Sequence, residues 1–353
     1  MKGGISGAMT GIMSVGILYI IVALIIKFIG KDWLDKLLPP VVIGPMIMII
    51  GLGLAPSAIS QIGIAAGSAM EWKTVLVAFV SFLVTAIVMT KAKGFFKVIP
   101  FLFGIISGYV VALMLGMIDF SAVGEAKFFA MPNFMLPFVD YKISFTALVT
   151  ILPIALVTIC EHIGDHKSLS NIIGKDLIKD PGLDRTLLGD GIATFVAGFL
   201  GGPANTTYGE NTSVVGMTKV ASVKVIGLAA IISIMFGFLG KFTALISTIP
   251  DAVLGGVSLL LYGFIAVNGL KVLISNQVDF EKPVNVITAS TMLVLGLGGA
   301  AISIVSGDLS VTISGMSLAS IAGIILNLAL RGKEYEEVVI EEKTKKGIKK
   351  STK

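Results

Sequence analysis

The chain has 353 residues, of which 55% are hydrophobic and only 14% charged, and its mean hydropathy is +0.95. About a quarter of the residues of a soluble domain are charged, so this composition excludes a soluble domain and predicts a polytopic membrane protein. The net charge of +5 does not indicate nucleic-acid binding, because most basic residues lie in short loops and in the tail, where membrane proteins carry them. The single cysteine, Cys160, excludes an intrachain disulfide.

Apolar segments recur from one end of the chain to the other, and we expect eleven of them to form helices in the membrane. They cover residues 6–26, 39–56, 74–90, 97–118, 144–165, 185–200, 208–220, 223–247, 250–272, 283–304 and 314–331. A crossing helix needs about 20 apolar residues, and the segments 39–56, 185–200 and 208–220 are short for that. The last two flank Gly201-Gly202-Pro203, and short segments interrupted by glycine and proline indicate the binding site of a transporter.

The basic residues predict the orientation of the chain. With the C-terminal tail in the cytoplasm, 22 of the 27 basic residues lie on the inside. Five remain outside, namely Lys2, Lys73, Lys127, Lys142 and Lys241. This orientation also places residue 1 outside, which we interpret as a sign that an odd number of spans precedes it in a longer protein.

Two carboxylates close the apolar run 144–165. Glu161 and Asp165 are four residues apart, so on a helix they face the same way. Away from water two such groups cannot both ionise at low cost, and one of them is expected to bind and release a proton. The alternative is that both are hydrated at the cytoplasmic mouth. His162 and His166 are interpreted as structural or mouth residues, and no metal site is expected.

A third carboxylate, Glu210, follows an interruption between two apolar segments. Pro203 removes a backbone donor and Thr206 and Thr207 favour an extended form, so residues 203–208 are expected to be a short strand within a broken helix. A helix that restarts near Gly209 presents backbone N–H groups in its first turn. These donors and a carboxylate suit a planar ligand with alternating N–H and C=O groups. The alternative is that Glu210 only stabilises its own helix N-terminus.

These residues resemble a known family of transporters. The run Glu210-Asn211-Thr212-Ser213-Val214-Val215-Gly216-Met217-Thr218-Lys219 is similar to the signature E-N-x-G-x-x-x-x-T-K/R of the nucleobase–ascorbate transporters, also called nucleobase:cation symporters, with Ser213 in place of the glycine. Five further runs resemble the bacterial uracil permease branch: Glu161-His162-Ile163-Gly164, Lys175-Asp176-Leu177, Asp180-Pro181-Gly182-Leu183, 205–210 and 255–263. The resemblance extends over essentially the whole chain.

The resemblance implies an all-α fold of two inverted repeats that form a core domain and a gate domain. The family has fourteen segments, and this chain is similar to segments four to fourteen, without the strand that opposes 203–208. The expected division is a core remnant at 1–30, gate helices at 31–118, an external loop at 119–143, core helices at 144–247, gate helices at 248–331 and a cytoplasmic tail at 332–353. We also expect a homodimer through the gate domain.

The resemblance also implies the function and the site. Glu161, Gly209, Glu210 and Tyr262 match substrate-binding positions, and Glu161 with Asp165 matches the proton-coupling pair, although the family has histidine where this chain has Asp165. The expected function is uracil import by proton symport at the plasma membrane, without a cofactor. Xanthine or another nucleobase is the alternative substrate. A non-transporting membrane fragment is the alternative of another class, and an enzyme is not expected because no nucleophile–base set or phosphate loop occurs.

Overall fold

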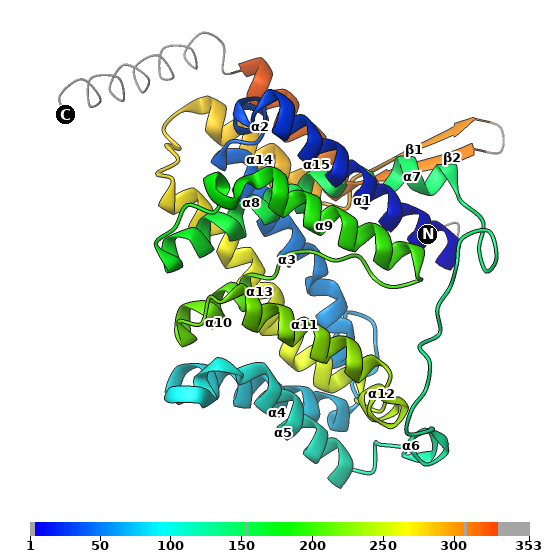
Figure 1. Ribbon diagram of the computed structural model, residues 1–353. Coiled ribbons are helices and arrows are strands. Elements are labelled where there is room, and N and C mark those ends of the chain that lie inside the picture. Colours follow the sequence, from blue (N-terminus) through cyan, green and yellow to red (C-terminus); the bar gives the residue numbers. More distant parts are fainter. Residues whose placement is uncertain (1–3, 153, 307–308, 331–353) are drawn as a thin grey trace.

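The computed structural model describes residues 4–152, 154–306 and 309–330 (Figure 1). The helices of the first part of the chain are α1 (Gly4–Ile29), α2 (Asp32–Leu37), α3 (Pro40–Ile62), α4 (Trp72–Lys91), α5 (Pro100–Met114) and α6 (Ser121–Glu125). The second part contributes α7 (Phe145–Ile151), α8 (Ile154–Ile173), α9 (Leu183–Phe199), α10 (Gly209–Thr218), α11 (Val223–Gly237), α12 (Gly240–Ser247), α13 (Asp251–Ser275), α14 (Pro283–Leu297) and α15 (Gly315–Leu330). A helix occurs within each of the eleven expected segments, which confirms the helical membrane fold.

Four helices within the described ranges are long and apolar enough to cross a membrane, namely α1, α3, α4 and α13. The apolar helices α5, α11, α14 and α15 are shorter. Helix α8 has 20 residues but carries Glu161, Asp165 and Lys167, so its composition departs from that of a simple span. Charged residues within a span are costly and often functional, which draws attention to α8.

Helices from the two ends of the chain pack together through glycines. Helix α3 lies along α13, and Figure 1 shows this pair running through the middle of the molecule. A Cβ atom on Gly269 of α13 would lie 2.5 Å from the carbonyl oxygen of Gly44 on α3. The backbones therefore approach as closely as glycine allows. Helices α4 and α5 pack on each other and on α13, and α14 and α15 pack on each other and on α3.

A second group is built around α1 and α9. A Cβ atom on Gly16 of α1 would lie 2.5 Å from the backbone nitrogen of Phe195 on α9, and one on Gly191 would lie 2.8 Å from Cβ of Tyr19. Helix α8 contacts both helices and also α3, while α10 packs on α8. These two groups contain the helices assigned above to the core and the gate, but the domain division itself stays a prediction.

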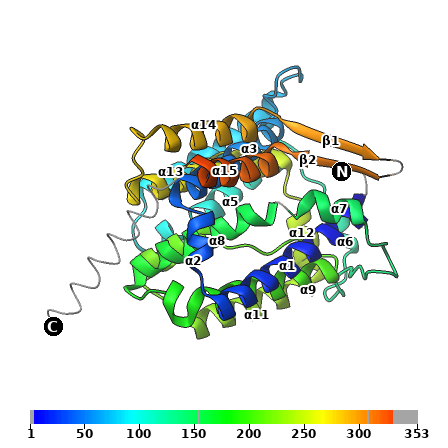
Figure 2. The ribbon, with the colours of Figure 1, turned by 90° about the horizontal axis from the view of Figure 1, so that it is seen from above.

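A β-hairpin follows α14, and most of its first strand lies in residues 301–304, which the sequence analysis expected to be the end of a helix. Helix α14 ends at Leu297, and the chain continues through Gly299, whose φ is +73°, into β1 (Ala301–Ser306) and β2 (Leu309–Ser314). The strands are antiparallel, with Ile302 opposite Ile313 and a hydrogen bond of 3.0 Å between the hydroxyls of Ser303 and Thr312. Figure 2 shows the hairpin extending beyond the end of α14, and its second strand contacts α7. Alternating β-branched and small polar residues favour this form over a helix.

The segment between α9 and α10 is irregular. Residues 203–208 do not pair with another strand within the described parts of the chain, although Tyr208 has extended backbone angles of −121° and 116°. The hydroxyl of Thr194 donates to the carbonyl oxygen of Asn205 at 3.0 Å and holds the segment against α9. The segment then delivers the chain to the start of α10, beside α8.

Candidate functional site

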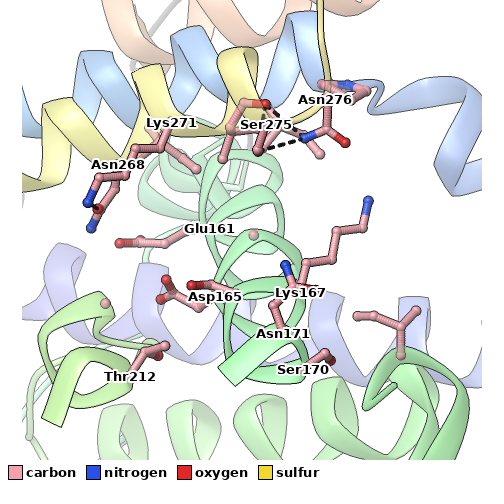
Figure 3. Close-up of a pocket in the computed structure, with 18 of the residues that line it drawn as sticks. Glu161, Asp165, Lys167, Ser170, Asn171, Thr212, Asn268, Lys271, Ser275 and Asn276 are labelled. Atoms are coloured by element: carbon pink, nitrogen blue, oxygen red, sulfur yellow. Dashed lines mark hydrogen bonds between the residues drawn. The ribbon is translucent and has the colours of Figure 1, made fainter. Parts of the chain in front are cut away.

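A pocket of about 1210 Å³ opens between α8, α10, α13 and the start of α3 (Figure 3). Its wall includes the two α8 carboxylates, the first residue of α10 and a polar stretch of α13. Polar and charged residues that line it are Lys31, Glu161, Asp165, Lys167, Ser168, Ser170, Asn171, Lys175, Asp176, Lys179, Thr212, Asn268, Lys271, Ser275 and Asn276. The pocket therefore joins segments that are distant in the sequence and that come from both helix groups.

The α8 carboxylates lie one turn apart on the side of α8 that faces the pocket. Glu161 and Asp165 are both half-buried, and Figure 3 shows them between Asn268 of α13 and Thr212 of α10. Gly164 brings α8 close to the other group of helices, since a Cβ atom there would lie 3.4 Å from Cδ1 of Ile47 on α3. Two acceptor groups are thus held at the boundary between α8 and the α3–α13 pair.

Helix α10 begins at Gly209, directly against both neighbours. A Cβ atom on Gly209 would lie 2.8 Å from Nδ2 of Asn268 and 3.4 Å from Oδ1 of Asp165. The amides of Asn211 and Thr212 both donate to the carbonyl oxygen of Tyr208, which starts the helix. The first turn of a helix presents N–H groups and a positive partial charge, and here its first residue lies beside Asp165.

Some of the predicted substrate-binding and proton-coupling residues meet in this pocket, and others do not line it. Glu161, Asp165 and Gly209 line the pocket. The backbone of Glu210 lies in the first turn of α10, but its side chain is outside what the structure describes. Tyr262 lies on α13 one turn before the pocket residue Ile265 and is not among the residues that line the pocket. Its carbonyl oxygen packs against Gly51 of α3.

Basic residues surround the mouth of the pocket, on the side that the sequence predicts to be cytoplasmic. Lys31 forms an ion pair with Asp35 at 2.6 Å, and Lys175 forms one with Asp180 at 2.9 Å. The hydrogen bond and the charge of Lys175 lower the pKa of the exposed Asp180 carboxyl. These pairs are solvent-exposed, so they contribute little to stability and mainly set the charge of the mouth.

His162 is buried behind the pocket wall, and this agrees with its interpretation as a structural residue. Its Nδ1 lies 3.0 Å from Oδ2 of Asp190 and its Nε2 lies 3.1 Å from Oγ1 of Thr186, both on α9. The ring also stacks on His166, with 4.1 Å between the ring centroids. His166 Nδ1 donates to the carbonyl oxygen of His162 at 2.8 Å. Within the described residues, no three His, Cys, Asp or Glu side chains are grouped so as to hold a metal ion.

Residues 1–305 match the sequence profile of a family described as the permease family. The chain belongs to this permease family. It is 47% identical over 341 residues to the uracil permease of Bacillus subtilis, an alignment that covers 95% of this chain and 78% of that protein. It is 46% identical to the uracil permease of Bacillus caldolyticus, with 94% and 76% covered. The uracil permease of Escherichia coli K12 is 40% identical, with 93% and 75% covered.

The family membership confirms the resemblance inferred from the sequence motifs, and the named relatives are transporters rather than enzymes. The sequence alone did not identify two polar residues that lie at or behind the pocket of this permease. Asp190 has a detectable signal, because it is a carboxylate within the apolar segment 185–200. Asn268 has no local signal beyond its polarity, and only its approach to Gly209 at the start of α10 reveals it.

Proposed function

We propose that this permease imports uracil across the plasma membrane by proton symport. The observation that carries the proposal is the pocket that brings Glu161, Asp165 and Gly209 together. The uracil permeases to which the chain is 40–47% identical support uracil as the substrate. A uracil ring offers N–H donors and carbonyl acceptors in one plane, and the pocket offers carboxylates and a helix N-terminus that complement them.

In this proposal Glu161 accepts a hydrogen bond from a ring N–H, and the backbone at Gly209 faces a ring carbonyl. Glu210 follows in the first turn of α10 and provides a second carboxylate for the ring. Tyr262 contributes from α13 when the helix groups move relative to each other. Each polar group of the ligand then exchanges a water partner for a protein partner, which gives selectivity among bases.

Proton coupling is assigned to Glu161 and Asp165. The side chains share one face of α8, one turn apart, so ionisation of one opposes ionisation of the other. A proton that enters with the substrate relieves this repulsion. Its release on the cytoplasmic side restores the repulsion and weakens substrate binding, so the proton gradient drives uptake.

We further propose that the C-terminal tail is cytoplasmic, that lipid surrounds the helices and that two copies associate through the gate helices. The pocket supports this orientation, because Lys167, Lys175 and Lys271 all line it and basic residues are enriched on the cytoplasmic side of membrane proteins. Labelling of single cysteines at Lys333 and Lys127 in intact cells tests it. Only the Lys127→Cys variant is expected to react with a membrane-impermeant thiol reagent.

Uptake of radiolabelled uracil tests the transport proposal. The purified permease in proteoliposomes is expected to accumulate uracil when the interior is alkaline, and an ionophore that collapses the proton gradient is expected to stop accumulation. Glu161→Gln should abolish uptake, whereas Glu71→Gln, which changes a carboxylate beside Thr74 at the start of α4, should retain it. Uptake of xanthine without uracil would favour the other nucleobase. Uptake of neither base would favour a non-transporting membrane protein and overturn the proposal.

A further inference from the structure

Asn268 lies where the two helix groups meet at the pocket. It is half-buried on α13, and its Nδ2 occupies space that a side chain at position 209 would need. Distances under 3.0 Å to a Cβ atom are essentially absent from protein structures, so the 2.8 Å separation leaves room for glycine alone at position 209 unless Asn268 moves. Asn268 and the first turn of α10 are therefore direct neighbours across the pocket wall.

The packing of α13 fixes the backbone that carries Asn268. The preceding turn includes the buried Ala266, and the next residue, Gly269, is pressed against Gly44 and Met48 of α3. Lys271 Nζ lies 3.5 Å from Oδ1 of Asn268. Nδ2 of the same amide lies on the side of Gly209, and Figure 3 shows Asn268, Glu161 and Asp165 in the same pocket.

A nucleobase in this pocket needs hydrogen-bond donors as well as acceptors from the protein. Ionised Glu161 and Asp165 only accept hydrogen bonds, so they satisfy the N–H groups of a nucleobase but not its carbonyl oxygens. A buried carbonyl without a donor loses its water partners and costs binding free energy. The first turn of α10 offers backbone donors, and the side-chain amide of Asn268, which lies beside Gly209, offers a further donor.

We propose that Asn268 donates a hydrogen bond to a ring carbonyl of the nucleobase and so determines substrate specificity from the gate side of the pocket. The proposal rests on the proposed nucleobase transport. Because Asn268 lies beside Gly209, a ligand carbonyl bound by Asn268 also contacts the start of α10. Ligand binding therefore depends on how closely α10 and α13 approach each other.

Ligands with one carbonyl oxygen replaced by sulfur provide the test, because a thiocarbonyl is a weaker hydrogen-bond acceptor. Competition of uracil uptake by 2-thiouracil and by 4-thiouracil is measured for the parent chain, Asn268→Ala and Asn268→Asp. The parent is expected to discriminate against one of the two thiouracils, and both variants are expected to lose that discrimination. Their KM for uracil should rise roughly tenfold, the factor for one lost hydrogen bond, with little change in kcat.

A second pair of variants separates ligand contact from packing. Gly209→Ala should lower uptake because the new methyl group overlaps the Asn268 amide, and Gly209→Ala with Asn268→Ala should recover kcat but retain the high KM. Asn133→Ala and Asn133→Asp serve as matched controls, because Asn133 is an exposed asparagine of the loop before α7 and does not line the pocket. Both should behave as the parent does.

The outcomes separate this inference from the proposed function. Parent-like KM and parent-like thiouracil discrimination in both Asn268 variants would overturn the assignment of Asn268 and leave uracil transport standing. Absence of uracil uptake by the parent chain would overturn the proposed function, and the role of Asn268 with it.

Discussion

His162 of α8 and Asp190 of α9 form a buried pair, with 3.0 Å between Nδ1 and Oδ2. The His162 side chain is 2% exposed and the Asp190 side chain 12% exposed, so water satisfies neither group well. The second ring nitrogen contacts Thr186, also on α9. Because His162 follows Glu161 directly, the pair holds α8 in the rotation that turns Glu161 toward the pocket.

Asp190→Ala is expected to destabilise the permease. Removing one partner leaves a buried polar group without its hydrogen bond, at a cost of roughly 3 kcal/mol. Thermal unfolding of the purified protein in detergent measures the loss as a lower midpoint. Asp180→Ala is the matched control, because Asp180 forms an exposed pair with Lys175 and its loss should leave the midpoint unchanged. Equal midpoints for the two variants would show that the buried pair contributes nothing to stability.

Two glycines on α9 allow a test of the close helix packing. A Cβ atom on Gly191 would lie 3.0 Å from the carbonyl oxygen of Gly16 and closer still to Tyr19, whereas one on Gly189 would meet no atom within 4 Å. Gly191→Ala should therefore destabilise the protein by roughly 1–3 kcal/mol through overpacking. Gly189→Ala should be neutral or stabilising, because alanine favours a helix by about 1 kcal/mol over glycine. Thermal unfolding midpoints of the two variants test this prediction. A lower midpoint for Gly189→Ala than for Gly191→Ala would contradict the close packing of α1 on α9.

Glu210→Gln tests the proposed hydrogen bond between the Glu210 carboxylate and a ring N–H of the nucleobase. The change replaces one acceptor oxygen with a donor, so a ring N–H loses its partner at a cost of roughly 1–3 kcal/mol. Uracil binding to the purified protein should weaken accordingly, or the preferred base should change. A uracil affinity equal to that of the parent chain would exclude Glu210 from the site.

Asp165→Asn tests the proposed coupling to protons. An amide cannot take up the proton that the carboxylate carries, so uptake should lose its dependence on the proton gradient while uracil binding is weakened less. Uracil accumulation in proteoliposomes with and without a pH gradient measures the first effect, and equilibrium binding measures the second. Gradient-driven accumulation by the variant at the parent level would contradict this role.

Local patterns in the sequence determined much of this permease. Runs of apolar residues predicted the helices, because each residue that faces lipid must be apolar and each backbone group must bond within its helix. The spacing of Glu161 and Asp165 predicted their common face, since residues four apart on a helix are neighbours. The prediction of a helix was wrong at residues 301–304, where apolar and β-branched residues are compatible with a helix or a strand and the first strand of the hairpin forms.

The tertiary structure decided which of these local features meet. No periodicity places Asn268 beside Gly209 or His162 beside Asp190, because such contacts depend on the distance and rotation of whole helices. Those are set by glycines such as Gly44 and Gly269, which let two backbones touch and so fix one helix against another. The sequence by itself therefore determined the chemical groups of the site, and helix packing decided how they face one another.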